Sequence, residues 1–165
     1  MLETKATGRI DVSRDTAINL EGRYYLSTDY PGSPNLTAGL ARLPISQTFG
    51  GSAGVTQRFN HLELLFKAGA DRTMWNESQL TDGSTFANTD RNLNQYSGQA
   101  RASYEVFPGV KPFVEVAGDT RVHDEKFDRN GMQRNSKALT PKVGTTFEIS
   151  KKLTGEVAAG YVMRK

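Results

Sequence analysis

Few side chains in this sequence could do acid–base or metal chemistry. The two histidines are His61, at a predicted turn, and His123, which precedes Asp124 and Glu125. Their spacing supplies no further metal ligands, and the absence of cysteine removes thiolate nucleophiles and thiolate metal sites. No zinc-protease, phosphate-loop or dinucleotide-binding motif occurs. We therefore expect a protein that is not an enzyme and holds neither a metal nor another cofactor.

Charged side chains instead recur at alternate positions along most of the chain, with both signs in similar number. An unpaired ion buried in a dry core costs several kcal/mol, whereas neighbouring strands around a wet interior can pair or hydrate such ions. We therefore predict that the row lines a lumen; a sheet with one solvated face is the alternative. The row comprises Arg9, Asp11, Glu21, Arg23, Arg58, Glu63, Lys67, Asp71, Arg101, Glu105, Glu115, Asp119, Arg121, Lys142, Glu148, Glu156 and Arg164.

The elements that carry this row have a period of two, which is typical of β-strands. Between His61 and Trp75, for example, Leu62, Leu64 and Phe66 alternate with Glu63 and Lys67. The pattern predicts eight strands, around 9–12, 18–26, 49–59, 61–75, 96–106, 112–122, 139–149 and 153–164. The residues that we expect to face lipid are Leu20, Val55, Leu64, Phe66, Ala102, Val116, Val143 and Val157.

Short and long connections alternate between the predicted strands. Tight turns are expected at 13–16, at Asn60, at 108–110 and at 151–152, and longer polar segments at 29–46, 77–93 and 128–136. This alternation predicts an antiparallel up-and-down meander with all tight turns at one end, as in outer-membrane barrels. Aromatic residues fall near both ends, Phe59, Tyr104 and Phe147 toward the turns and Phe49, Tyr96 and Tyr161 toward the loops.

Composition is compatible with a transmembrane barrel. The 165 residues fit one domain, spanning 1–165, with 36% hydrophobic residues and a mean hydropathy of -0.55. No segment approaches the roughly 20 apolar residues that a spanning helix needs, whereas a barrel strand exposes only alternate residues to lipid. The net charge of +3 is spread along the chain and forms no basic block, so no nucleic-acid partner is expected.

Three runs resemble the β-barrel porins of proteobacteria. They are QYSGQARASYEVFPGVKPFVEVAGDTRVHD, VGTTFEISKKLTGEVAAGYVMR and GSAGVTQRFNHLELLFKAGADR, which together cover much of the chain. The resemblance implies an all-β barrel, or part of a larger one, in the bacterial outer membrane of a Gram-negative cell. Members of that family begin with an export signal and finish with a strand ending in an aromatic residue. This sequence does neither, so we expect an internal fragment of a longer barrel.

The functional hypothesis is a porin-like barrel for passive diffusion of small hydrophilic solutes, or for envelope structure, with membrane lipid as its partner. One alternative is a small closed eight-stranded structural or adhesive outer-membrane protein. Another is a soluble lipocalin-like ligand-binding barrel, which would need an apolar interior and a polar exterior. The solute, the ion selectivity, the oligomeric state and the full strand number stay open at this stage.

Overall fold

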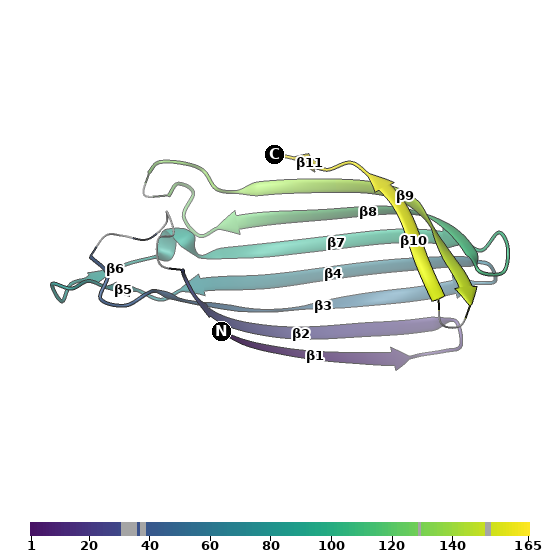
Figure 1. Ribbon diagram of the computed structural model, residues 1–165, viewed down its shortest axis with the longest axis horizontal. Coiled ribbons are helices and arrows are strands. Elements are labelled where there is room, and N and C mark those ends of the chain that lie inside the picture. The colour runs from purple at the N-terminus through teal and green to yellow at the C-terminus, as the bar shows by residue number, and fades with distance from the viewer. Residues whose placement is uncertain (31–35, 37–38, 129, 151–152) are drawn as a thin grey trace.

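The computed structural model describes residues 1–30, 36, 39–128, 130–150 and 153–165 (Figure 1). Long antiparallel strands run side by side in one sheet, and a separate two-stranded sheet lies in a loop. The elements are β1 Leu2–Asp11, β2 Thr16–Thr28, β3 Ile45–Phe59, β4 Leu62–Trp75, β5 Ser78–Gln79, β6 Thr85–Phe86, the 3-10 turn η1 Thr89–Arg91, β7 Leu93–Tyr104, β8 Val110–His123, β9 Ser136–Ser150, β10 Leu153–Gly160 and β11 Met163–Arg164.

The main sheet is an antiparallel meander with the order β1-β2-β3-β4-β7-β8-β9-β10, and β11 also pairs with β9. This confirms the predicted fold class, and each predicted segment lies in or overlaps a strand. Several strands are longer than the alternation alone indicated: β1 begins at Leu2, and β3 has 15 residues. Strands of soluble domains usually have about five or six residues, whereas crossing a bilayer takes about nine to eleven.

Tight turns join the hairpins at one end of the sheet, on the right in Figure 1. The amides of Val12 and Ser13 both donate to the Thr16 carbonyl, closing the first turn. Asn60 adopts a left-handed φ of 55° between β3 and β4, and Gly109 has φ 83° between β7 and β8. Asparagine and glycine tolerate this conformation best, which is why these turns can be so short. The fourth predicted turn, 151–152, lies outside the described residues.

Successive hairpins are staggered along the strand direction. Asp11, the last residue of β1, lies in the same cross-strand row as Leu65 of β4. β4 extends beyond this row toward the turns, as far as Leu62. The β8–β9 ladder likewise continues past the last β7–β8 pair to Val110 and Phe147. Each hairpin therefore reaches farther at the turn end than the one before. Strands that tilt around a barrel axis require a stagger of this kind.

Pro141 explains why the last strand is divided. It lies in the middle of β9, and its carbonyl accepts a hydrogen bond from the Tyr161 amide. Proline has no N–H to return to the ladder. β10 therefore stops at Gly160 and β11 resumes at Met163 in the same register. The sheet is open in the described residues, with β1 at one edge and β10 with β11 at the other.

The long connections gather at the opposite end of the sheet (Figure 1). The segment between β4 and β7 contains the β5–β6 hairpin and η1, which the sequence did not predict. No helix in the described ranges is long and apolar enough to span a membrane.

Candidate functional site

The strand register separates side chains onto two faces of the sheet. We call the charged face the one that carries the predicted lumen residues, and the apolar face the other. Cross-strand partners share a face, so Arg23, Gly50, Asp71 and Gln95 form one row on the charged face. The register places on the charged face Arg9, Asp11, Glu21, Arg23, Arg58, Glu63, Lys67, Asp71, Arg101, Glu115, Asp119, Arg121, Lys142, Glu148, Glu156 and Arg164. Glu105 follows the end of β7, and its amide donates to the His61 carbonyl.

Burial is inverted relative to a soluble protein. On the apolar face Phe66 and Val143 are each 58% exposed and Val157 is 69% exposed, whereas Glu115 on the charged face is only 5% exposed. The residues that the sequence predicts to face lipid all lie on the apolar face: Leu20, Val55, Leu64, Phe66, Ala102, Val116, Val143 and Val157. Large apolar side chains are thus left open, whereas charged side chains such as Glu115, Arg23 and Asp71 are buried or half-buried.

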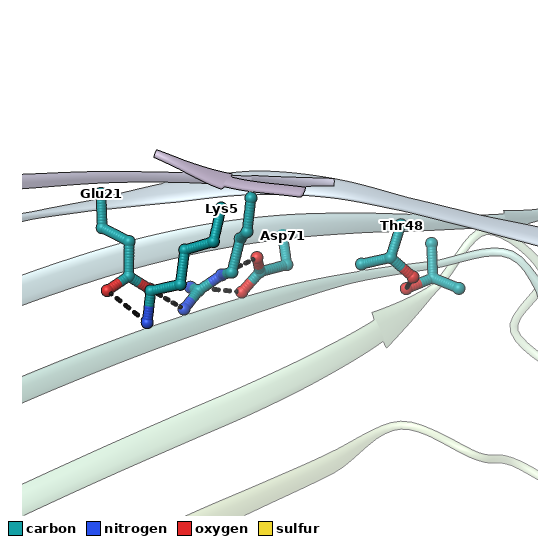
Figure 2. A network of polar contacts seen from close by, with 6 residues as sticks. Lys5, Glu21, Thr48 and Asp71 are labelled. Carbon is teal, nitrogen blue, oxygen red and sulfur yellow. Dashed lines mark hydrogen bonds and ion pairs between the residues drawn. The ribbon is translucent and has the colours of Figure 1, made fainter. Parts of the chain in front are cut away.

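One charged network joins β1, β2 and β4 (Figure 2). Lys5 Nζ lies 3.1 Å from Glu21 Oε2, and Arg23 Nη1 lies 2.9 Å from Glu21 Oε1. Arg23 also donates to both carboxylate oxygens of Asp71, at 2.8 and 2.9 Å. Arg23 and Asp71 reach each other across β3 because Gly50, between them in the row, has no side chain. A Cβ there would collide with Asp71 Oδ1.

A second charged network joins β7 to β10. Arg101 lies 3.5 Å from Glu115 and 2.8 Å from Glu156, and Lys142 lies 2.9 Å from Glu115. The Arg101 guanidinium also stacks 3.5 Å above the ring of Phe113. Charges of opposite sign from four strands are therefore neutralised in one place, where their mutual attraction offsets part of the cost of covering them.

The other members of the charged row are less connected. Arg58 pairs with Glu63 at 2.7 Å and Arg9 with Asp11 at 2.9 Å, both near the turn end. Arg121 donates to the Gln95 side chain at 3.2 Å. The structure brings no ion-pair partner from the described residues to six members, which are Lys67, Glu105, Asp119, Arg121, Glu148 and Arg164.

The apolar face is free of charge along most of each strand. In the described strands and their paired ends, its charged members are Arg72, Lys137 and Lys165, each toward the loop end of its strand. Near the first turn, the Thr16 hydroxyl on this face donates a hydrogen bond to the side-chain oxygen of Gln57 at 2.6 Å. Uncharged side chains with internally satisfied hydrogen bonds are what a lipid environment demands.

The loop end is held together by polar contacts between connections. Arg91 of η1 pairs with Asp29 at 2.7 Å and lies 4.6 Å above the Trp75 ring. Arg72 makes a two-point ion pair with Asp124, and this guanidinium holds the pKa of the Asp124 carboxyl below its usual range. These contacts tie the loop after β8 and the loop before β7 to the sheet.

Asp128 organises the loop between β8 and β9. Its carboxylate accepts hydrogen bonds from the amides of Met132 at 2.9 Å and Asn130 at 2.8 Å and from Arg134 Nε at 2.7 Å. These donors, the Met132 amide above all, lower the pKa of Asp128. The turn closes at Gly131, whose φ is 74°.

The sequence prediction missed several features of the two faces. Phe113 and Leu65 are apolar residues on the charged face, and Lys5 is a further cation there. The charged residues of the apolar face, Arg72, Lys137 and Lys165, were also missed. Phe113 fits because Gly144 beside it leaves room: a Cβ at Gly144 would lie 2.7 Å from the phenyl ring. Gly144 is therefore the feature of the sequence that could have indicated space for Phe113 on the charged face.

The described residues form neither a nucleophile elbow nor a cluster of metal ligands. The run from Gly50 to Gly54 matches the GxSxG pattern, but Ser52 lies inside β3 rather than on the strand-to-helix turn of a nucleophile elbow. Within the described residues, no group of three or more His, Asp or Glu side chains is placed to hold a metal ion.

A long-stranded antiparallel meander with one apolar and one charge-bearing face is the architecture of the membrane β-barrel class. The family model described as Putative beta-barrel porin 2 matches residues 1–165, and the chain belongs to this family. This agrees with the resemblance drawn from the three sequence runs. No curated protein and no solved structure matches the chain.

Proposed function

We propose that this chain contributes to a bacterial outer-membrane barrel through which small hydrophilic solutes diffuse passively, or which supports the envelope, without catalysis. One observation carries the proposal: large side chains of the apolar face are open, whereas most members of the two charged networks are buried or half-buried and paired with one another. In water this arrangement would expose a large contiguous apolar surface, a feature of membrane or interaction sites. In a membrane the apolar face meets lipid and the charged face lines the interior.

The dimensions of the apolar face support this placement. From Leu62 near the turn to Arg72 near the loops, β4 rises about 34 Å at ~3.4 Å per residue. A tilt of about 40° reduces this to a height of about 26 Å, close to the roughly 25 Å apolar band of outer-membrane barrels. The charged residues of the apolar face then lie at the edge of the band.

The charged face suits weakly selective passage. Many of its acidic and basic groups are paired, and the members of the charged row without an ion pair in the described residues are three cations and three anions, so no strong field of one sign is left to steer ions. Passage also depends on width, because about eight strands make an interior filled by side chains and about sixteen leave an aqueous channel. A lipocalin-like role needs an apolar interior and is disfavoured by the paired charges.

Solute uptake by vesicles tests the proposal. The protein is folded into phospholipid vesicles, and swelling is followed after mixing with small sugars and amino acids of graded size. We expect swelling that decreases with solute size, and recovery of the protein with the outer-membrane fraction of cells. Fractionation with the outer membrane but no swelling would support the envelope role instead. A monodisperse protein in buffer without detergent would contradict both roles.

A further inference from the structure

Two lysines lie opposite each other on the apolar face. The Lys137 amide donates to the Lys165 carbonyl and the Lys165 amide donates to the Lys137 carbonyl, both at 2.8 Å. Antiparallel residues that exchange both bonds have Cα atoms about 5.5 Å apart and project to the same side. Ala138 and Arg164, the chain neighbours of Lys137 and Lys165, belong to the charged face. Lys137 and Lys165 therefore point away from that face.

This pair lacks a negative partner in the part of the chain that the structure describes. No ion pair joins either lysine to a carboxylate. Asp119 lies on the charged face, behind the sheet, and Asp124 is engaged by Arg72. Like charges directly opposite each other on neighbouring strands are destabilising. An anion bound between the two ammonium groups would remove that repulsion.

The row next to the lysines is apolar. Leu139 and Met163 pair directly below Lys137 and Lys165, and each is 45% exposed. Tyr161, farther toward the turn end, is also exposed. A cationic row beside an exposed apolar row is complementary to an amphiphile with an anionic headgroup and an acyl chain. A free inorganic anion would use only the first row.

We propose that Lys137 and Lys165 bind the phosphate of an anionic membrane lipid whose acyl chain lies along Leu139 and Met163. The site goes beyond solute passage, because it lies on the face opposite the charged networks and does not require a conducting lumen. It places the loop end of β9 and β11 at the headgroup level of the membrane, where lysines attract anionic lipids.

Lipid binding to the folded chain in detergent micelles tests the site. Phosphatidylglycerol and phosphatidylcholine are titrated separately, and the bound fraction is read by native mass spectrometry. We expect phosphatidylglycerol to bind more tightly, and the double variant Lys137→Gln with Lys165→Gln to weaken its binding about 30-fold, from about fivefold per lysine. Lys137→Arg with Lys165→Arg should retain the affinity. Lys126→Gln, in the loop after β8, is the charge-matched control and should leave it unchanged.

Competition with inorganic phosphate separates a lipid site from a free-anion site. Phosphatidylglycerol that stays bound in millimolar phosphate supports the lipid, because the acyl chain adds contacts that phosphate lacks. Displacement at equal concentrations would overturn the lipid assignment. Equal binding of the two lipids, or full binding by a glutamine double variant that keeps the wild-type circular dichroism, would overturn the site itself.

Discussion

Arg23 of β2 and Asp71 of β4 form a two-point ion pair across an intervening strand, directly over Gly50 of β3. Two strands with one strand between them lie about 10 Å apart, which is two strand spacings. The long arginine side chain spans this distance only because the residue beneath it has no Cβ. The ion pair therefore depends on the glycine, where a Cβ would also lie 2.5 Å from the Ala70 carbonyl oxygen of β4.

Replacing Gly50 by valine should destabilise the folded protein by about 1 to 3 kcal/mol, the usual cost of overpacking. The new side chain would occupy the place of the Asp71 carboxylate. Urea unfolding in lipid vesicles measures the change. Gly98→Ala is the matched control, because a Cβ at Gly98 meets nothing within 4 Å, and its effect should stay within about 0.5 kcal/mol. Equal midpoints for the two variants would contradict the dependence.

Arginine on the apolar face should be costly in a bilayer. Val157 lies in the middle of β10 on that face, so Val157→Arg should destabilise by about 2 to 4 kcal/mol. Leu64 lies on the same face near the turn end of β4, so Leu64→Arg should also destabilise, but by less. Gln99→Arg on the charged face is the control and should be tolerated. Urea titration in vesicles compares them, and unchanged midpoints for the first two variants would reject the facing.

Two charge reversals on the charged face should both change ion selectivity, but only one of them should lower the stability of the folded protein. Arg121→Glu removes a cation whose side chain bonds only Gln95 in the described structure, so ion selectivity should move toward cations with little loss of stability. Arg101→Glu should move it the same way but also destabilise, because Glu115 and Glu156 lose their shared partner. Reversal potentials across a planar bilayer under a salt gradient measure the first effect. An unaltered potential for Arg121→Glu would place that side chain outside the permeation path.

The β8–β9 loop should loosen in acid. The pKa of Asp128 is lower in the folded loop than the usual value of about 3.9. The ionised carboxylate therefore stabilises the loop above that usual value, and this contribution is lost as pH falls through the lower folded pKa. Hydrogen exchange at the Met132 amide, corrected for its intrinsic pH dependence, should show protection at neutral pH that persists at the usual aspartate pKa of about 3.9 and is lost at still lower pH. Asp128→Ala should lack this protection even at neutral pH. Wild-type protection that persists in strong acid would contradict the account.

Alternation alone predicted most of the strands and the faces of their residues. A side chain's face follows from its position in a strand with period two, so Leu64 and Glu63 are separated without knowing any partner. The tight turns were equally readable, because Asn60 and Gly109 have the residue types that a left-handed turn favours.

Cross-strand partners and loop structure were not predictable in the same way. Alternation says nothing about which residue in another strand lies beside Phe113, and this partner, Gly144, decides whether an aromatic fits among charges. The Arg91–Trp75 stacking and the β5–β6 hairpin arise from contacts between loops, which have no period. The aromatic girdles stay a prediction.

The accessibility of two adjacent residues tests the central claim, that the charged face is wet and the apolar face meets lipid. Gln99 and Ala100 are neighbours in β7 on opposite faces, and the chain has no cysteine of its own. Gln99→Cys and Ala100→Cys are folded separately into phospholipid vesicles and treated with a membrane-impermeant maleimide. We expect Gln99→Cys to be labelled and Ala100→Cys to be protected until detergent and urea unfold the barrel. Labelling of Ala100→Cys with protection of Gln99→Cys would contradict the account.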